Sequence, residues 1–561
     1  MKKYIHVSNF IGVSLLLFMF NIVAILSTLL LLGSHCQHGI FSVSLFLSIV
    51  ITVYLFSKNL SKKELLICSL TVLLLIIASI LFCGSILSYD YDGNSYHKVA
   101  IGFLKNGWNP ILESGRIFSE RYFNSTAVSG TSVWIDHYGK STWLFSSVIY
   151  LITNNIECGK AYQLLGCISL FCISFSYFLS NKKKIIKSVL LAFLLAFNPV
   201  SLSQLLTFYV DGYLFSLLYI LMIALFQLAD NIIIDKKVSW IMIFSSMILL
   251  SNVKFTGLLY GGVACILVYG GMFIYSTFIN KQYIPQNRLL KYLFTFATLA
   301  VLCICWIGYP TYITNFIDHG SFTYPLTGDG KIDIITSNSP AGFVGKNAIY
   351  QFFYGIFGRM GNVLYDIENP LPKLKIPFSL HASELVIPSV DTRISGFGFF
   401  FSGLLIVSLI GILFYITNKQ NSKNHRLFVS LALLLILSSS FAIPAGYWAR
   451  YNPFLWLVIL IYIYIYEPTS KIKNNLYMGY IILLLINTLY FILAPIQYTY
   501  RSYFKDSRLV SGTKIKTDLS LGCYPGVLFN LEDDGITYEI VDILENSDGY
   551  AYCIPYAYCD E

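Results

Sequence analysis

The chain has 561 residues, of which 56% are hydrophobic and 12% are charged, and its formal net charge is +9 at pH 7. Soluble domains carry about 25% charged residues, so this composition excludes an ordinary soluble enzyme. Most Lys and Arg residues lie in short segments between long apolar runs, which is the distribution of the positive-inside rule. The net charge therefore does not indicate a nucleic-acid partner, and we expect an all-α polytopic membrane protein.

Apolar runs divide the chain into alternating membrane and loop regions. We expect three spans within 1–88, a first external loop with interfacial helices over 89–158, and further spans over 159–309. A second external loop over 310–395, four spans over 396–496 and a small external C-terminal domain over 497–561 follow. Each run is long enough to cross a bilayer as a helix, which gives about thirteen spans. They lie near 9–32, 39–57, 64–88, 160–180, 184–200, 210–230, 237–252, 256–279, 289–309, 396–417, 426–443, 452–467 and 476–495.

The segment 141–154 decides the topology. It is apolar, but its length of about fourteen residues is short of the roughly 20 that a span needs. If it is re-entrant or interfacial rather than spanning, every basic cluster lies on one face of the membrane, as the positive-inside rule requires. We therefore expect a cytoplasmic N-terminus, with both long loops and the C-terminal tail on the external face.

The first external loop opens with two aspartates, Asp90 and Asp92, at a membrane boundary. One carboxylate could act as a general base; alternatively the D-x-D pair could hold Mg²⁺ or Mn²⁺ against a phosphate leaving group. A solvated turn that caps the next helix is the third alternative. We expect that helix to be amphipathic and to lie in the membrane interface. Its apolar face would carry Tyr96, Val99, Ala100, Phe103 and Leu104, with His97, Lys98 and Lys105 away from that face.

Lys254 and Arg450 are basic residues in short external turns, where the topology rule does not favour them. Either could bind a phosphate, Arg as a planar fork and Lys as a point charge, or could be a cation that snorkels from a span end. Asp211, close after Tyr209, is either a helix cap or a third acid. Asp136, His137 and Lys140 either line the mouth of a cavity or belong to a plain loop.

The C-terminal tail contains apolar runs over 527–531 and 536–543, separated by Glu-Asp-Asp-Gly, which predict a β-hairpin. Three cysteines, Cys523, Cys553 and Cys559, lie in this tail. One disulfide among them is an expectation, whose pairing the sequence leaves open.

Several short segments, taken in chain order, resemble motifs of bacterial GT-C glycosyltransferases. These enzymes take a sugar from a polyprenyl-phosphate donor on the outer face of the membrane. Asp92-Gly-Asn-Ser-Tyr-His97 is similar to the start of that family's first external loop, and Trp134-Ile-Asp-His-Tyr-Gly-Lys140 to its end. The other segments are Thr207-Phe-Tyr-Val-Asp211, Val253-Lys-Phe-Thr-Gly257, Asn315-Phe-Ile-Asp-His-Gly-Ser-Phe-Thr-Tyr-Pro325, Gly396-Phe-Gly398 and Trp448-Ala-Arg-Tyr451.

The resemblance implies that Asp92 is the base or the acid that orients the acceptor. Asp90 departs from the family pattern, and it is a second catalytic acid, a metal ligand or a bystander. Lys254 and Arg450 would hold the donor phosphate. The acceptor would be a glycan or lipid of the cell envelope, and the protein would lie among the lipids of a bacterial cytoplasmic membrane. Many members are metal-independent, so Mg²⁺ or Mn²⁺ is an alternative rather than a requirement. Further substrate-binding residues would be Tyr96, His97, Asp136, His137, Tyr209 and Asp211.

Two other functions are alternatives to sugar transfer from a polyprenyl-phosphate donor. A polymerase or ligase of lipid-linked oligosaccharides would need external cations, but no acid in the first external loop. A flippase or transporter of lipid-linked sugars commonly has repeated halves and ionisable residues near mid-membrane. The predicted spans here are nearly free of charge, and we see no internal repeat.

Overall fold

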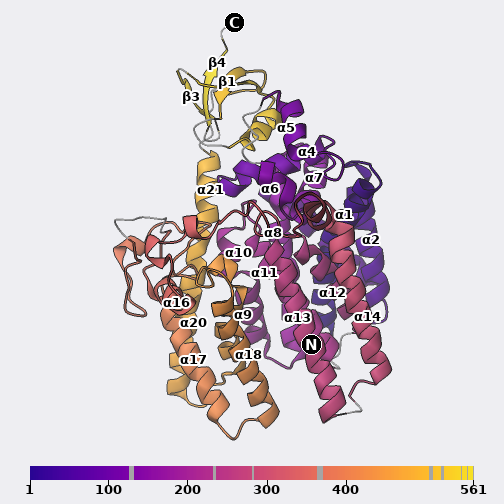
Figure 1. Cartoon of the computed structure of the whole chain (residues 1–561). Helices are drawn as coiled ribbons and strands as arrows, with labels where there is room; N and C mark the ends of the chain where they lie inside the picture. Colours follow the sequence, from indigo (N-terminus) through magenta and orange to yellow (C-terminus); the bar gives the residue numbers. More distant parts are fainter. Residues whose placement is uncertain are drawn as a thin grey trace. The chain divides into compact units, whose positions relative to one another are not determined.

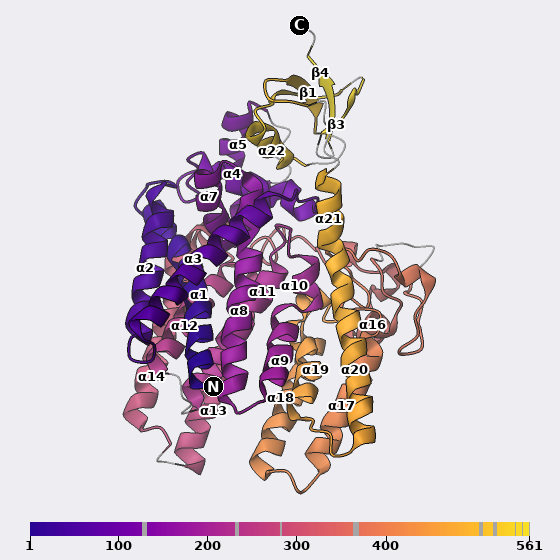
Figure 2. The same cartoon turned by 180° about the vertical axis from the view of Figure 1, so that it is seen from behind.

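The computed structural model describes residues 1–125, 132–230, 235–280, 283–362, 370–503, 509–519, 524–544, 546–551 and 554–559. The chain divides into two compact units (Figures 1 and 2). The first unit comprises Met1–Lys184, Leu206–Lys331 and Tyr498–Glu561, and the second comprises Ile185–Leu205 and Ile332–Gln497. Within each unit, most of the chain is helical.

The first unit is built around α1 (Lys2–Leu31), which packs against α2, α3, α7, α8 and α12 and is largely buried. Its helices are α1, α2 (Gly39–Phe56), α3 (Lys62–Gly84), α4 (Lys98–Lys105), α5 (Gly115–Phe123), α6 (Ser132–His137), α7 (Ser141–Thr153), α8 (Ala161–Ser180), α11 (Asp211–Ala229), α12 (Lys236–Ser251), α13 (Phe255–Ile274), α14 (Gln286–Leu302), α15 (Thr314–His319) and α22 (Val527–Asp533).

The second unit packs α17 against α18, α19 and α20, with α9 against α19. Its helices are α9 (Ile185–Ala196), α10 (Pro199–Ser203), α16 (Ala348–Phe357), α17 (Phe401–Thr417), α18 (Lys423–Ala442), α19 (Pro453–Ile465) and α20 (Lys471–Leu489). The boundary with the C-terminal part of the first unit falls within α21 (Leu493–Tyr503).

Nine helices of the described part of the chain are long and apolar enough to cross a membrane. The protein is therefore an all-α, multi-pass membrane protein. Four of the predicted spans are not among these nine helices, because α9, α12, α17 and α19 are shorter than 18 residues. The segment expected as a span over 184–200 breaks at Asn198, which caps α10 with Pro199 in its first turn. The count of thirteen spans stays a prediction.

The helix after Asp92 exists, but its environment differs from the expected one. It begins as a π-helix (Gly93–His97) and continues as α4. The residues from Val99 to Leu104 are buried, and so are His97 and Lys98, each 1% exposed. Since α5, α7 and α22 pack against α4, its polar residues are enclosed by protein and do not form the expected exposed polar face.

The C-terminal domain contains a four-stranded sheet in the order β2-β1-β4-β3. Its strands are β1 (Lys514–Asp518), β2 (Thr537–Val541), β3 (Gly549–Ala551) and β4 (Ile554–Tyr558). The prediction of a hairpin was wrong, because 527–531 forms α22 and β2 pairs parallel with β1. Parallel neighbours need a crossover, which α22 supplies. Cys523 and Cys553 lie outside the described residues, so the disulfide stays a prediction.

Asn487, in α20, is a buried polar residue that fixes the turn before α17. Its Nδ2 donates to the Phe397 carbonyl at 2.7 Å, and its Oδ1 accepts from the Phe400 amide at 2.9 Å. Gly398, in this turn, has φ +116, and a Cβ there would lie 2.3 Å from Asn487 Oδ1. Glycine is therefore required where the backbone meets this side chain.

We expect Asn487→Leu to lower the free energy of unfolding by about 2–4 kcal/mol, because it leaves a buried amide and a buried carbonyl without partners. Thermal unfolding of the purified protein in detergent measures this loss. Ile486→Leu is the matched control, since Ile486 is 50% exposed. Equal melting temperatures for the two variants would contradict the structural role of Asn487.

Candidate functional site

Asp90 and Asp92 have different environments. Asp90 is 2% exposed, and its carboxylate accepts from the Ser88 hydroxyl, the Gly93 amide (2.8 Å) and the Phe208 amide (3.4 Å). Burial raises the pKa of Asp90, although these donors act in the opposite direction. Asp92 directly precedes the π-helix and is half-buried. Asp90 therefore shapes the turn, and Asp92 is the more accessible acid.

A buried cluster of charges, the Glu157 cluster (Asp90, Lys98, Glu157 and Lys160), lies beside this turn. Glu157 accepts from Lys98 Nζ at 2.5 Å, from Lys160 Nζ and from the Ser88 amide at 3.1 Å. Glu157 and both lysines are at most 1% exposed. Lys98 also acts electrostatically on Asp90, so two acids balance two lysines. Sequence reasoning missed this cluster; the available signal was the Glu157–Lys160 spacing of three at a helix start.

The C-terminal domain is attached to the same region through α22 (Figure 2). Asn530 accepts from Lys98 Nζ at 2.9 Å and donates to Glu157 at 3.0 Å. The Gly526 amide donates to the Asn94 carbonyl at 2.7 Å. Phe529 packs so closely on Gly102 that a Cβ there would lie 2.3 Å from its ring. Residues distant in the sequence thus hold the helix that follows Asp92.

Asp533, at the end of α22, makes a second attachment. Its carboxylate accepts from the Tyr150 hydroxyl at 2.7 Å and from the Ile156 amide at 2.8 Å. Burial raises the pKa of Asp533 to about 6. These bonds join α22 to α7 and to the 3₁₀ turn (Ile156–Lys160) that carries Glu157.

Two residues singled out separately from the sequence form one ion pair. Lys254 Nζ lies 3.0 Å from Asp211 Oδ1, and the side chains are 8% and 2% exposed. The carbonyl of Tyr209, just before Asp211, accepts from the Tyr162 hydroxyl at 3.1 Å. Lys254 therefore lies in a buried, charge-compensated position rather than on a snorkelling span end.

Tyr96 and His97 belong to an aromatic group with Tyr138 and Trp143. The Trp143 indole N–H donates to His97 Nδ1 at 2.6 Å. The Tyr96 ring lies 4.4 Å from the His97 ring and 5.9 Å from that of Tyr138, measured between centroids. The motif at the start of the first loop thus contacts the motif at its end.

His137 joins the first loop to the second. Its Nδ1 lies 2.6 Å from Asn315 Oδ1, and its ring packs on Tyr324 at 4.7 Å. The His319 ring also stacks on the Tyr324 ring, with 3.7 Å between the centroids. Burial lowers the pKa of His137 to about 4, so the imidazole is neutral near pH 7.

Asp136, the preceding residue, accepts from the Gly115 amide at 2.5 Å, and burial raises the pKa of the Asp136 carboxyl.

Lys140 is a buried lysine at the start of α7, 1% exposed. Its Nζ donates to the carbonyls of Asp136 (2.7 Å) and Tyr138 (3.1 Å) and lies 3.5 Å from the Thr311 hydroxyl. Burial lowers its pKa to about 7. The amide of the next residue, Ser141, donates to the Asn252 carbonyl at 2.9 Å. Lys140 therefore connects the first loop to the second rather than facing the mouth of a cavity.

Arg450 lies in the second unit, where Nη1 is 2.9 Å from Asp391 Oδ1. Arg393, which sequence reasoning missed, binds the other oxygen of the same carboxylate at 3.1 Å. Both guanidinium groups lie about 5 Å from the Trp448 ring (5.2 Å for Arg393 and 5.1 Å for Arg450). Gly396 allows this turn to approach, since a Cβ there would lie 2.8 Å from Ala449 Cβ.

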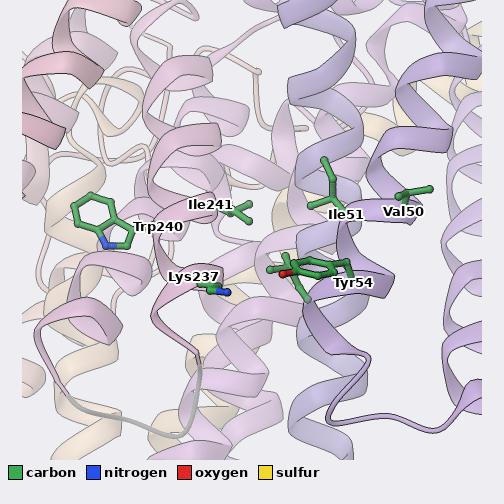
Figure 3. A pocket seen from close by; sticks show the side chains of 7 residues that line it. Val50, Ile51, Tyr54, Lys237, Trp240 and Ile241 are labelled. Atoms are coloured by element: carbon green, nitrogen blue, oxygen red, sulfur yellow. The ribbon is translucent and has the colours of Figure 1, made fainter.

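Within the described residues, no three His, Cys, Asp or Glu side chains gather in a group that could hold a metal ion. Of the D-x-D pair, Asp90 already accepts from three protein donors. A groove of about 640 Å³ has a different character (Figure 3). It is lined by apolar side chains of α2 and α12 together with Tyr54, Trp240 and Lys237, and contains none of the predicted site residues.

No protein-family model, curated protein or solved structure matches the chain.

We expect the buried position of Lys140 to make the stability of the first unit depend on pH. Between about pH 7 and the unfolded pKa of about 10.4, the unfolded chain binds one more proton than the folded one. The free energy of unfolding should therefore rise with pH in this window, by at most about 1.4 kcal/mol per pH unit. The additional stability that the folded protein has above the unfolded pKa of Lys140 is lost as the pH falls through 7.

Thermal unfolding of Lys140→Met across this pH range tests the assignment. The variant removes the titrating group, so its melting temperature should vary less with pH than that of the wild type. Lys58→Met, at an exposed position, should keep the full dependence. An unchanged pH profile in Lys140→Met would show that another group is responsible.

Proposed function

We propose that the protein is a GT-C-like membrane glycosyltransferase that moves a sugar from a polyprenyl-phosphate donor to a glycan or lipid acceptor of the cell envelope. The reaction would take place on the external face of a bacterial cytoplasmic membrane, with the N-terminus cytoplasmic and the C-terminus external. The observation that carries this proposal is the convergence of separate motifs within the first unit. Asp90 accepts from the Phe208 amide, Lys254 pairs with Asp211, and His137 meets Asn315.

Asp92 is the acid to which we assign the proton transfer. It is half-buried at the start of a helix whose other residues are fixed by the Glu157 cluster and α22. In the proposed step, the acceptor hydroxyl oxygen attacks the anomeric carbon and Asp92 takes the hydroxyl proton. The bond from the anomeric carbon to the phosphate oxygen breaks, and polyprenyl phosphate leaves with the electron pair. Direct displacement inverts the anomeric centre.

Basic residues would stabilise the negative charge of the donor and of the leaving phosphate. We assign this role to Lys254 in the first unit and to Arg450 in the second. Each already has a carboxylate neighbour, Asp211 and Asp391 respectively, which holds the cation in place and moderates its charge. Tyr96, His97, Asp136, His137 and Tyr209 are proposed to shape the substrate site, and a divalent ion at Asp92 stays an alternative.

Asp92→Asn should lower the rate of sugar transfer by about 10² to 10⁴, the usual contribution of a general base, and should leave donor binding unchanged. The assay incubates the purified protein with a panel of polyprenyl-phosphate sugars and measures released polyprenyl phosphate. Asp329→Asn, at an exposed position of the first unit, is the matched control and should keep full activity.

Full activity of Asp92→Asn would contradict the assignment and favour a polymerase or ligase, which needs no acid in this loop. Movement of lipid-linked sugar across vesicles without release of polyprenyl phosphate would instead favour a flippase.

A further inference from the structure

The segment 374–387 of the second unit has an inverted arrangement of polar and apolar side chains. The following apolar residues, at every second position, are 38–78% exposed: Leu374, Ile376, Phe378 and Leu380. Lys375, between the first two, is buried and pairs with the buried Glu384. The next three residues, Leu385, Val386 and Ile387, are apolar and about half exposed. A surface that faces water rarely carries such runs, so we expect this one to contact an apolar partner.

The helix α16 continues this apolar surface. Its outward side chains include Ile349 and Phe353, which are 68% and 48% exposed and lie one turn apart on the same side of the helix. The Lys375 amide donates at 3.0 Å to the carbonyl of Phe357, the last residue of α16. The end of α16 therefore lies beside the segment 374–387. We call Ile349, Phe353 and the exposed apolar residues of 374–387 the apolar rim.

The apolar rim is continuous with helices that are long and apolar enough to cross a membrane. Helix α16 packs against α17 and α18 (Figure 1), and the Phe352 ring lies 5.1 Å from the ring of Phe441, in the last turn of α18, between centroids. The Tyr490 hydroxyl, directly after α20, donates to the Val386 carbonyl at 2.7 Å. Both α18 and α20 are candidate spans. Leu434, two turns before Phe441 on the same side of α18, is exposed as well. The rim thus extends a surface that lipid tails would cover.

The exposed charges beside the rim have the sign that a phospholipid surface attracts. The Lys, Arg, Asp and Glu residues of 341–362 and 370–387 are Lys346, Arg359, Lys373, Lys375 and Glu384. Glu384 is buried, whereas Lys346 and Lys373 are exposed. Lys346 Nζ lies 5.7 Å from the centre of the Tyr350 ring in α16, and Lys373 directly precedes Leu374. Basic and aromatic side chains beside an apolar stripe are typical of helices that lie in a membrane interface.

We propose that the apolar rim is embedded in the lipid leaflet at which α18 ends, with α16 lying in the plane of the interface. The apolar side chains of the rim contact acyl chains, and Lys346 and Lys373 reach the lipid phosphates. Lipid, in addition to α17 and α18, then holds this part of the second large loop against the bilayer. The inference goes beyond the proposed function, because it concerns the membrane contact of the second unit and holds for any reaction.

The test is carbene footprinting of the full chain in phosphatidylcholine nanodiscs, with the labelled peptides identified by mass spectrometry. One reagent is a diazirine that partitions into the bilayer, and the other is a water-soluble diazirine. The ratio of labelling by the first reagent to labelling by the second should be several-fold higher at Ile349, Phe353 and 385–387 than at Ile543, an exposed apolar residue of the C-terminal domain. It should approach the ratio at Leu434, the control for a side chain that faces lipid.

The double variant Ile349→Asp, Phe353→Asp places two carboxylates on the rim. It should lower the labelling ratio of the α16 peptide towards that of Ile543, because a carboxylate is costly inside a bilayer. Ile543→Asp should leave the ratio of the α16 peptide unchanged. Labelling of the wild-type rim mainly by the water-soluble reagent would overturn the proposal, whether or not the double variant folds. Weak labelling by both reagents would also overturn it, and two chains per particle in detergent would then assign the rim to a contact between copies of the chain.

Discussion

The carboxylate of Glu157 is the constraint on which the proposed active region of the first unit depends. It is buried between two lysines and also accepts from the Ser88 amide and from Asn530. Charges so far from water are costly unless their partners are held in good geometry. The partners come from the turn before Asp92, from α4, from the 3₁₀ turn before α8 and from α22, so the Glu157 cluster can form only when these segments are in place.

This arrangement separates structural charges from those available to a substrate. Asp90 and Lys98 are enclosed by protein partners, whereas Asp92, two residues after Asp90, is half-buried. Lys254 is fixed by Asp211. In the second unit, the Nε and Nη1 atoms of Arg393 are buried and have no hydrogen-bond acceptor among the described residues. In the first unit, Asp90 and Lys98 therefore serve the fold, and Asp92 is the partly accessible acid of the same turn.

The sequence predicted the helical membrane class and most helices, because a span must be long and apolar whatever it packs against. It also singled out His137, Lys254 and Asp211, but no pattern in it predicted that His137 contacts Asn315 or that Lys254 pairs with Asp211. It failed where the partner is remote: Lys98 was expected away from the buried apolar face, but Glu157 and Asn530 enclose it. The run 527–531 was read as a strand, because a short apolar run does not distinguish strand from helix. No sequence pattern singled out Arg393, because its contacts with Asp391 and Trp448 are visible only in the structure.

The most direct test of this account is hydrogen exchange in Glu157→Gln, a change that leaves two buried lysines without their charge partner. Removing one member of a buried pair costs about 3–5 kcal/mol, so exchange should accelerate by 10² or more at the dependent sites. The account predicts a joint acceleration in the segments that contain the amides of Ser88, Gly93, Phe208 and Gly526, and none in Glu64→Gln, which removes a more exposed acid. Acceleration confined to the Ser88 segment would contradict it, because the other segments would then be held independently of Glu157.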